Sequence, residues 1–227
     1  GDCDQVAYID DCGECDDTPN TDCIDLEIVL HPGTNLISFP ALAENLNIEA
    51  IFPDCVDGVL AEGAAAINTG DMWIGSIEEV SAKKGYWAII DEEESCVIEI
   101  MDAEPTSYDF DGMVIYDIHV GSNLISYPYL ASQAIDDGFG DASLNIYGLL
   151  GEGAAAINID NSWLGTLVAL EGSKGYWLVA LEDFTFLFNE PDGDLSRIVK
   201  QPVQRSIPEV YSYTQSSKQS FYFIERA

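Results

Sequence analysis

The chain has 227 residues, 47% of them hydrophobic, which is enough apolar material for one large domain or two small ones. Its 41 acidic and 8 basic residues give a formal net charge of −33, which excludes an electrostatic nucleic-acid binder and disfavours docking on an anionic membrane surface. No apolar run approaches the ~18 residues that a membrane helix needs, so we expect no membrane insertion.

The first 25 residues form an acidic, cysteine-rich segment. Residues 2–25 hold eight aspartates and four cysteines. Calcium takes roughly six to eight oxygen ligands, and loops dense in aspartate can supply them. The segment is similar to thrombospondin type 3 repeats, which bind calcium in Asp-rich loops, although it lacks a clean D-x-D-x-D-G run. We therefore expect calcium as a cofactor, with the candidate ligands Asp2, Asp4, Asp10, Asp11, Asp16, Asp17, Asp22 and Asp25.

Three alternatives remain open for this segment. Its C-x-x-C pair, flanked by two further cysteines, is compatible with a four-cysteine zinc site, but the aspartates favour a harder cation. A redox role would need a thioredoxin-like βαβ pattern, which does not follow. The third alternative is a solvated acidic linker held only by disulfides.

The six cysteines indicate disulfides and an oxidising compartment. Cys3, Cys12, Cys15 and Cys23 predict two disulfides whose connectivity the sequence leaves open. Cys55 and Cys96 are otherwise unpartnered, and Asn145 and Phe186 stand at the corresponding positions of the repeat described next. We expect Cys55 and Cys96 to bond to each other. The opening Gly-Asp-Cys, without an initiator methionine, suggests a piece of a longer protein.

Most of the chain is a tandem repeat. The motif HPGTNLISFP at 31–40 returns as HVGSNLISYP at 119–128, an offset of 88 residues. The motifs EGAAAIN at 62–68 and KGYW at 84–87 return at an offset of 90, so two residues are inserted in the loop between the anchors. We predict an N-terminal segment at 1–25, repeat 1 at 26–101, a linker at 102–113, repeat 2 at 114–189 and a tail at 190–227.

Each copy has the pattern of short strands. Runs rich in Val, Ile, Tyr, Trp and Phe are separated by Gly, Pro, Asn and Asp. In repeat 1 they lie at 26–31, 35–40, 72–80, 84–90 and 96–101, with one helical turn at 43–51. A unit of about five or six strands is small, so we expect the copies to pack as a pair. The predicted fold class is all-β, with two pseudo-symmetric β-sandwich or barrel-like repeats.

The four tryptophans, at 73, 87, 163 and 177, occupy matched positions in the two copies. We expect them to anchor the core or the contact between sheets. The alternative is an aromatic platform for sugars, which would need their faces exposed in a row.

A resemblance follows from these motifs. The combination G-x-N-L-I-S-[FY]-P with K-G-Y-W about 50 residues later resembles a repeat of large secreted, modular surface proteins of marine and other environmental bacteria, and of their viruses. It covers about two thirds of the chain. The resemblance implies an extracellular or cell-surface location, or alternatively a location on a virion. It also implies a structural role, since the motif carries no known chemistry.

No catalytic motif is evident. The sequence lacks H-E-x-x-H and G-x-S-x-G, and EGAAAI lacks the G-K-[ST] ending of a phosphate loop. His31 and His119 precede a glycine in each copy, which indicates a cap or strand end. We expect no enzyme.

The C-terminal tail differs chemically from the rest of the chain. Five of the eight basic residues lie in the last 31 positions, next to the alternating stretches EVYSY and SFYFIE. Such strands can pair within their own domain, begin a further β module, or add to a neighbouring subunit. If the strands add to a neighbouring subunit, the candidate assembly residues are Tyr211, Tyr213, Phe221, Tyr222 and Phe223.

These features predict a structural or adhesive module of an extracellular, cell-surface or fibre-like assembly, stabilised by disulfides and calcium. Its partners would be further copies, in a fibre or filament, or neighbouring modules of a larger protein. The alternative is a carbohydrate-binding module with a glycan as its partner.

Overall fold

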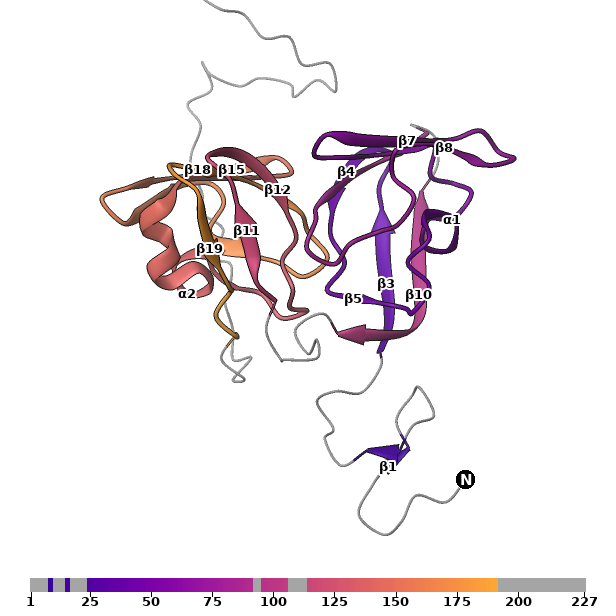
Figure 1. Ribbon diagram of the computed structural model, residues 1–227, viewed down its shortest axis with the longest axis horizontal. Coiled ribbons are helices and arrows are strands. Elements are labelled where there is room, and N and C mark those ends of the chain that lie inside the picture. Colours follow the sequence, from indigo (N-terminus) through magenta and orange to yellow (C-terminus); the bar gives the residue numbers. More distant parts are fainter. Residues whose placement is uncertain (1–7, 10–14, 17–23, 92–94, 106–113, 192–227) are drawn as a thin grey trace, which may run out of the picture. The chain divides into compact units, whose positions relative to one another are not determined.

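The computed structural model describes residues 8–9, 15–16, 24–91, 95–105 and 114–191 (Figure 1). These residues are mostly antiparallel β-structure, as predicted from the sequence. In the N-terminal segment, strands β1 (Tyr8–Ile9) and β2 (Cys15–Asp16) pair with each other. The rest of the described chain forms the two repeats.

Repeat 1 has two antiparallel sheets and one helical turn. The five-stranded sheet has the order β4 (Gly33–Ile37), β9 (Tyr86–Ile90), β6 (Gly58–Ala61), β7 (Ala64–Asn68), β8 (Trp73–Gly75). The three-stranded sheet has the order β3 (Ile24–Leu30), β10 (Cys96–Pro105), β5 (Ala41–Leu42). Helix α1 (Ile48–Ile51) begins after Asn47, whose side-chain oxygen accepts a hydrogen bond from Glu49 N at 3.0 Å.

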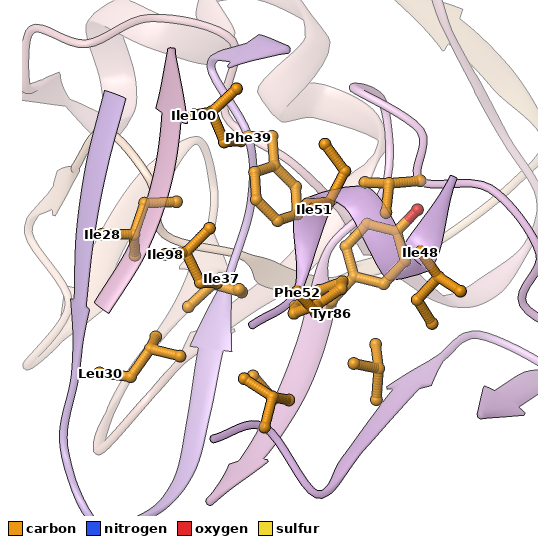
Figure 2. Packing of buried hydrophobic residues seen from close by; sticks show 14 of the residues in the cluster. Ile28, Leu30, Ile37, Phe39, Ile48, Ile51, Phe52, Tyr86, Ile98 and Ile100 are labelled. Atoms are coloured by element: carbon orange, nitrogen blue, oxygen red, sulfur yellow. The ribbon is translucent and has the colours of Figure 1, made fainter. Parts of the chain in front are cut away.

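The core of repeat 1 lies between these elements (Figure 2). Strands β3 and β10 alternate buried and exposed residues, so that Ile28 and Ile98 point inward as a cross-strand pair. Phe39 and Tyr86 meet Phe52 at ring-centroid distances of 5.7 and 6.5 Å. Burial of this cluster holds the two sheets together.

Repeat 2 reproduces this arrangement. Its five-stranded sheet has the order β12 (Gly121–Ile125), β18 (Tyr176–Ala180), β14 (Ile146–Gly151), β15 (Ala154–Ile159), β16 (Ser162–Gly165). Strand β11 (Tyr116–Ile118) pairs with β19 (Phe184–Phe186), and β13 (Gln133–Ala134) pairs with β17 (Ala169–Leu170). The longer loop of this copy contains helix α2 (Ile135–Phe139) and a 3-10 helix, η2 (Gly140–Asn145).

The two cores are closed differently at one matched position. In repeat 1 a disulfide joins Cys55 to the buried Cys96, which confirms the predicted pair. In repeat 2 Phe186 occupies the place of Cys96, and its ring lies 5.2 Å from Tyr116 and 5.0 Å from Phe188. An aromatic cluster therefore replaces the covalent link.

Two local features differ from the sequence-based expectation. The strands at 58–61 and 64–68 form a hairpin that the sequence pattern did not single out, because glycine and alanine have low strand propensity. Pairing of β6 with β9 imposes the extended backbone there. The helical turn expected at 43–51 is confined to Ile48–Ile51.

Candidate functional site at the junction of the two repeats

The repeated motifs meet at a junction between repeat 1 and repeat 2. Each repeat contributes to the junction a tight turn that carries a histidine. Asn35 clamps this turn, since its amide donates to the His31 carbonyl oxygen at 2.8 Å and its Oδ1 accepts from His31 N at 2.9 Å. Gly33 follows at φ 97°, a conformation that favours glycine. His119, Gly121 and Asn123 repeat the arrangement in the second copy.

Each turn is met by a glutamate from the other repeat. The carboxylate of Glu62 contacts His119 Nε2 at 2.6 Å and accepts a hydrogen bond from Leu124 N at 2.8 Å. Reciprocally, Glu152 contacts His31 Nε2 and accepts from Leu36 N at 3.1 Å. Both glutamates belong to the EGAAAIN motif, so each copy of that motif binds the histidine turn of the opposite copy.

Backbone hydrogen bonds extend the same symmetry. Gly85 N donates to the Leu124 carbonyl oxygen, and Gly175 N donates to the Leu36 carbonyl oxygen, both at 3.2 Å. Beside them, Ser38 N donates to the Ser173 carbonyl oxygen at 3.1 Å. Its counterpart, Ser126 N, donates to the Lys83 carbonyl oxygen at 3.2 Å. The chain thus adds a strand-like contact between the KGYW motif of one repeat and the NLIS motif of the other.

The glycine of each KGYW motif permits this approach. A Cβ on Gly175 would lie 2.6 Å from the Ile37 carbonyl oxygen and 3.1 Å from Leu36 Cδ1. A Cβ on Gly85 would lie 2.8 Å from the Ile125 carbonyl oxygen and 3.0 Å from Leu124 Cδ1. Both leucines are almost fully buried and lie outside the two repeat cores, so their burial comes from the junction.

The histidines at the junction favour the protonated state. In each ring, Nδ1 faces the carbonyl oxygen of the next residue and Nε2 faces a carboxylate, so both nitrogens have only acceptors as partners. The hydrogen bond to that carbonyl, followed by the bond to Glu152 or Glu62, raises the pKa of His31 and of His119 above the usual range. Neither ring presents a free basic nitrogen, which argues against either histidine as a general base.

The aromatic residues of KGYW have separate roles. The hydroxyl of Tyr86 accepts a hydrogen bond from Ser81 N, and that of Tyr176 accepts from Glu171 N, both at 2.7 Å. These bonds fix the turn before each KGYW motif. The tryptophan that follows points to the opposite face of the sheet and is half-buried.

The tryptophans therefore divide into two pairs. Trp73 packs on Phe52 and Trp163 on Phe139, each with ring centroids 6.0 Å apart, at the margin of the two cores. Trp87 and Trp177 lie outside the cores. The expectation of an anchoring role thus holds for the first pair.

Most of the predicted calcium ligands lie outside the described residues. Asp25 is exposed, and its Oδ1 accepts a hydrogen bond from Asp102 N at 3.4 Å. For Asp16 only the backbone, in β2, is described. Within the described part of the chain no group of three or more His, Cys, Asp or Glu side chains is placed to hold a metal. The other predicted ligands outside the description are Asp2, Asp4, Asp10, Asp11, Asp17 and Asp22.

The assembly residues and the N-terminal cysteines also fall outside the described side chains. This applies to Tyr211, Tyr213, Phe221, Tyr222, Phe223, Cys3, Cys12, Cys15 and Cys23, although the backbone of Cys15 is part of β2.

A cleft of about 540 Å³ in repeat 2 offers no catalytic pair. It lies between the segments 139–142 and 184–187, and Asp141 is the one charged residue among those that line it. In a second cleft, of about 380 Å³ in repeat 1, Glu78 and Glu79 lie near Lys84.

Sequence reasoning missed the role of Glu62 and Glu152. One signal was available in the sequence. The only two histidines of this acidic chain stand at matched positions of the two repeats, and so do Glu62 and Glu152. Cross-repeat pairing is nevertheless a tertiary contact, which strand periodicity does not encode.

Comparison of the chain with protein-family models, with curated proteins and with solved structures found no match. None of the helices in the described ranges is long and apolar enough to cross a bilayer.

Proposed function

We propose that the chain is a structural module of an extracellular assembly, in which the joined repeats act as a spacer or subunit. The observation that carries this proposal is that residues of the repeated motifs join one repeat to the other. His31 and His119, Glu62 and Glu152, and the glycines of the two KGYW motifs all serve to join the repeats.

The junction suits a load-bearing role because it combines several kinds of contact. It has charge-assisted hydrogen bonds, backbone hydrogen bonds and a buried leucine, each present once in either repeat. A hinge between the repeats would have to break these interactions together. The Cys55–Cys96 disulfide further limits unfolding of repeat 1 and fits an oxidising compartment.

Calcium is the second part of the proposal. The eight aspartates at 2–25 repel one another unless a cation neutralises them. Calcium bound there would stiffen the N-terminal segment ahead of the repeats.

The carbohydrate-binding alternative has weaker support. Trp73 and Trp163 pack against the cores rather than forming a row. Trp87 and Trp177 are half-buried among aliphatic residues. The polar side chains on those sheet faces are the hydroxyls of Thr34, Ser122 and Ser162. A sugar needs more hydrogen-bonding groups than this.

Sedimentation velocity of the full chain over a range of concentrations, with calcium and then with chelator, tests the proposal. We expect assemblies that grow with concentration and weaken on chelation. A monomer at every concentration that binds a defined glycan on an array would overturn the proposal in favour of the alternative.

A further inference from the structure

The outer faces of the two five-stranded sheets are uncharged. The cross-strand register places nine residues on this face in repeat 1 and eleven in repeat 2, and none of them is acidic or basic. Because 22% of the chain is charged, composition alone does not explain this. We call these surfaces the outer faces. They comprise Thr34, Leu36, Gly58, Leu60, Ala65, Ile67, Ile74, Trp87 and Ile89 in repeat 1, and Ser122, Leu124, Gly148, Leu150, Ala155, Ile157, Ile159, Ser162, Leu164, Trp177 and Val179 in repeat 2.

Large aliphatic residues on the outer faces are open to solvent. Three matched pairs, at offset 90, are between 41% and 61% exposed. A contiguous apolar surface of this kind marks an interaction site in a soluble protein. The pairs are Leu60 with Leu150, Ile67 with Ile157, and Ile74 with Leu164.

The outer faces continue into the junction. Leu36 lies beside Trp87 on the face of repeat 1 and packs over Gly175, two positions before Trp177 of the other face. Leu124 does the same over Gly85. The two faces therefore adjoin an interface that is already apolar.

Acidic residues surround the outer faces at the ends of their strands. Asp57 directly precedes β6, Asp71 lies between β7 and β8, and Asp160 lies between β15 and β16, all exposed. An occupant must therefore be apolar at its centre and basic at its margins.

We propose that the outer faces bind the C-terminal segment, residues 196–227, of a neighbouring copy of this chain. This inference rests on the proposed function, since it requires copies to associate. Residues 196–227 carry five basic and two acidic residues, a net charge of +3, whereas residues 1–195 carry −36. The same segment holds the alternating stretches EVYSY and SFYFIE. On an extended backbone Tyr211 and Tyr213 would share one side, as would Phe221 and Phe223.

Charge favours this occupant over a second body. Two bodies of charge −36 that stack face to face would repel each other. The C-terminal segment supplies both the cationic and the aromatic character that the outer faces and their acidic margins require.

Photo-crosslinking of the full chain tests the inference. Tyr222 is replaced by p-benzoyl-phenylalanine, and equal amounts of ¹⁴N and ¹⁵N chains are mixed so that mixed-isotope products identify crosslinks between copies. We expect such crosslinks at residues of the outer faces. In the double variant Ile67→Asp/Ile157→Asp their yield should fall by about tenfold or more, because each buried isoleucine contact is replaced by a carboxylate.

Val29→Asp is the matched control. Val29 is 67% exposed on β3, away from the outer faces, so this change should leave the crosslink yield as in the wild type. Circular dichroism verifies that all variants remain folded.

Several outcomes would overturn the inference, and they separate it from the proposed function. Crosslinks confined to single chains would overturn this inference alone, provided that the chain still self-associates in sedimentation. Crosslinks between copies that map elsewhere than the outer faces would do the same. A third outcome would also overturn it: Ile67→Asp/Ile157→Asp abolishes association, but position 222 gives no crosslinks to the outer faces. The outer faces would then stack on each other instead of binding the C-terminal segment. A monomer at every concentration would overturn both.

Discussion

Substituting alanine for Gly175 or Gly85 should destabilise the protein through the junction. Neither glycine has a positive φ, so alanine brings no backbone strain of its own. At such a position Gly→Ala ordinarily stabilises by about 0.4–1 kcal/mol. Here the new Cβ of Gly175→Ala would lie 2.6 Å from the Ile37 carbonyl oxygen, in the opposite repeat.

The size of the effect follows from the contacts that must move. The distance from the new Cβ to the Ile37 carbonyl oxygen must lengthen to an ordinary contact of about 3.4 Å. This shift displaces the backbone that carries the Gly175–Leu36 and Ser38–Ser173 hydrogen bonds, which are now 3.2 and 3.1 Å long. Overpacking costs about 1–3 kcal/mol. Each weakened hydrogen bond costs up to about 1 kcal/mol. We expect a net loss of about 2–3 kcal/mol for each substitution.

Urea unfolding followed by circular dichroism measures this loss. Gly58→Ala is the matched control, since its Cβ would meet nothing closer than the Ala66 carbonyl oxygen at 3.4 Å, within its own repeat. The control should be neutral or slightly stabilising. If Gly175→Ala and Gly85→Ala unfolded at the same urea concentration as Gly58→Ala, the junction described here would be wrong.

Three further predictions concern pH, the disulfide and calcium. The raised pKa values of His31 and His119 mean that their stabilisation is complete below the usual histidine pKa and is lost as pH rises through the raised values. The free energy of unfolding should therefore fall as pH rises above the usual histidine pKa of about 6.5, and a slope unchanged in Glu62→Gln/Glu152→Gln would contradict the pairing. Replacing Cys55 and Cys96 by alanine opens a link across 41 residues and should cost about 4 kcal/mol in urea unfolding; a loss below about 1 kcal/mol would argue against the link. Chelation should lower the melting temperature in calorimetry, and an unchanged temperature would leave the aspartates as a solvated spacer.

The sequence was sufficient to predict the repeats, the all-β class and the Cys55–Cys96 pair. Each followed from local information: motifs at a constant offset, alternation within short runs, and two cysteines without counterparts. The β6–β7 hairpin escaped prediction because its Ala64–Ala66 run has little strand propensity. Neighbouring strands determine its conformation instead.

The junction was harder to foresee. The glycine of KGYW was expected to allow a close backbone approach, but the identity of the approaching segment depends on how the repeats pack. The glutamate of EGAAAIN looked like one carboxylate among many, since 41 acidic residues obscure any single one. Its role becomes evident only when Glu62 and His119, which are 57 residues apart, are seen in contact.

The most direct test of the central claim, that the two repeats behave as one mechanical unit, is urea unfolding followed by ¹⁹F NMR of the full chain labelled with 5-fluorotryptophan. Trp73 and Trp87 report on repeat 1, and Trp163 and Trp177 on repeat 2. We predict that all four native signals disappear at the same urea concentration, and that Gly175→Ala separates the pairs into two transitions. Two separate transitions in the wild type, unmoved by Gly175→Ala, would contradict the account.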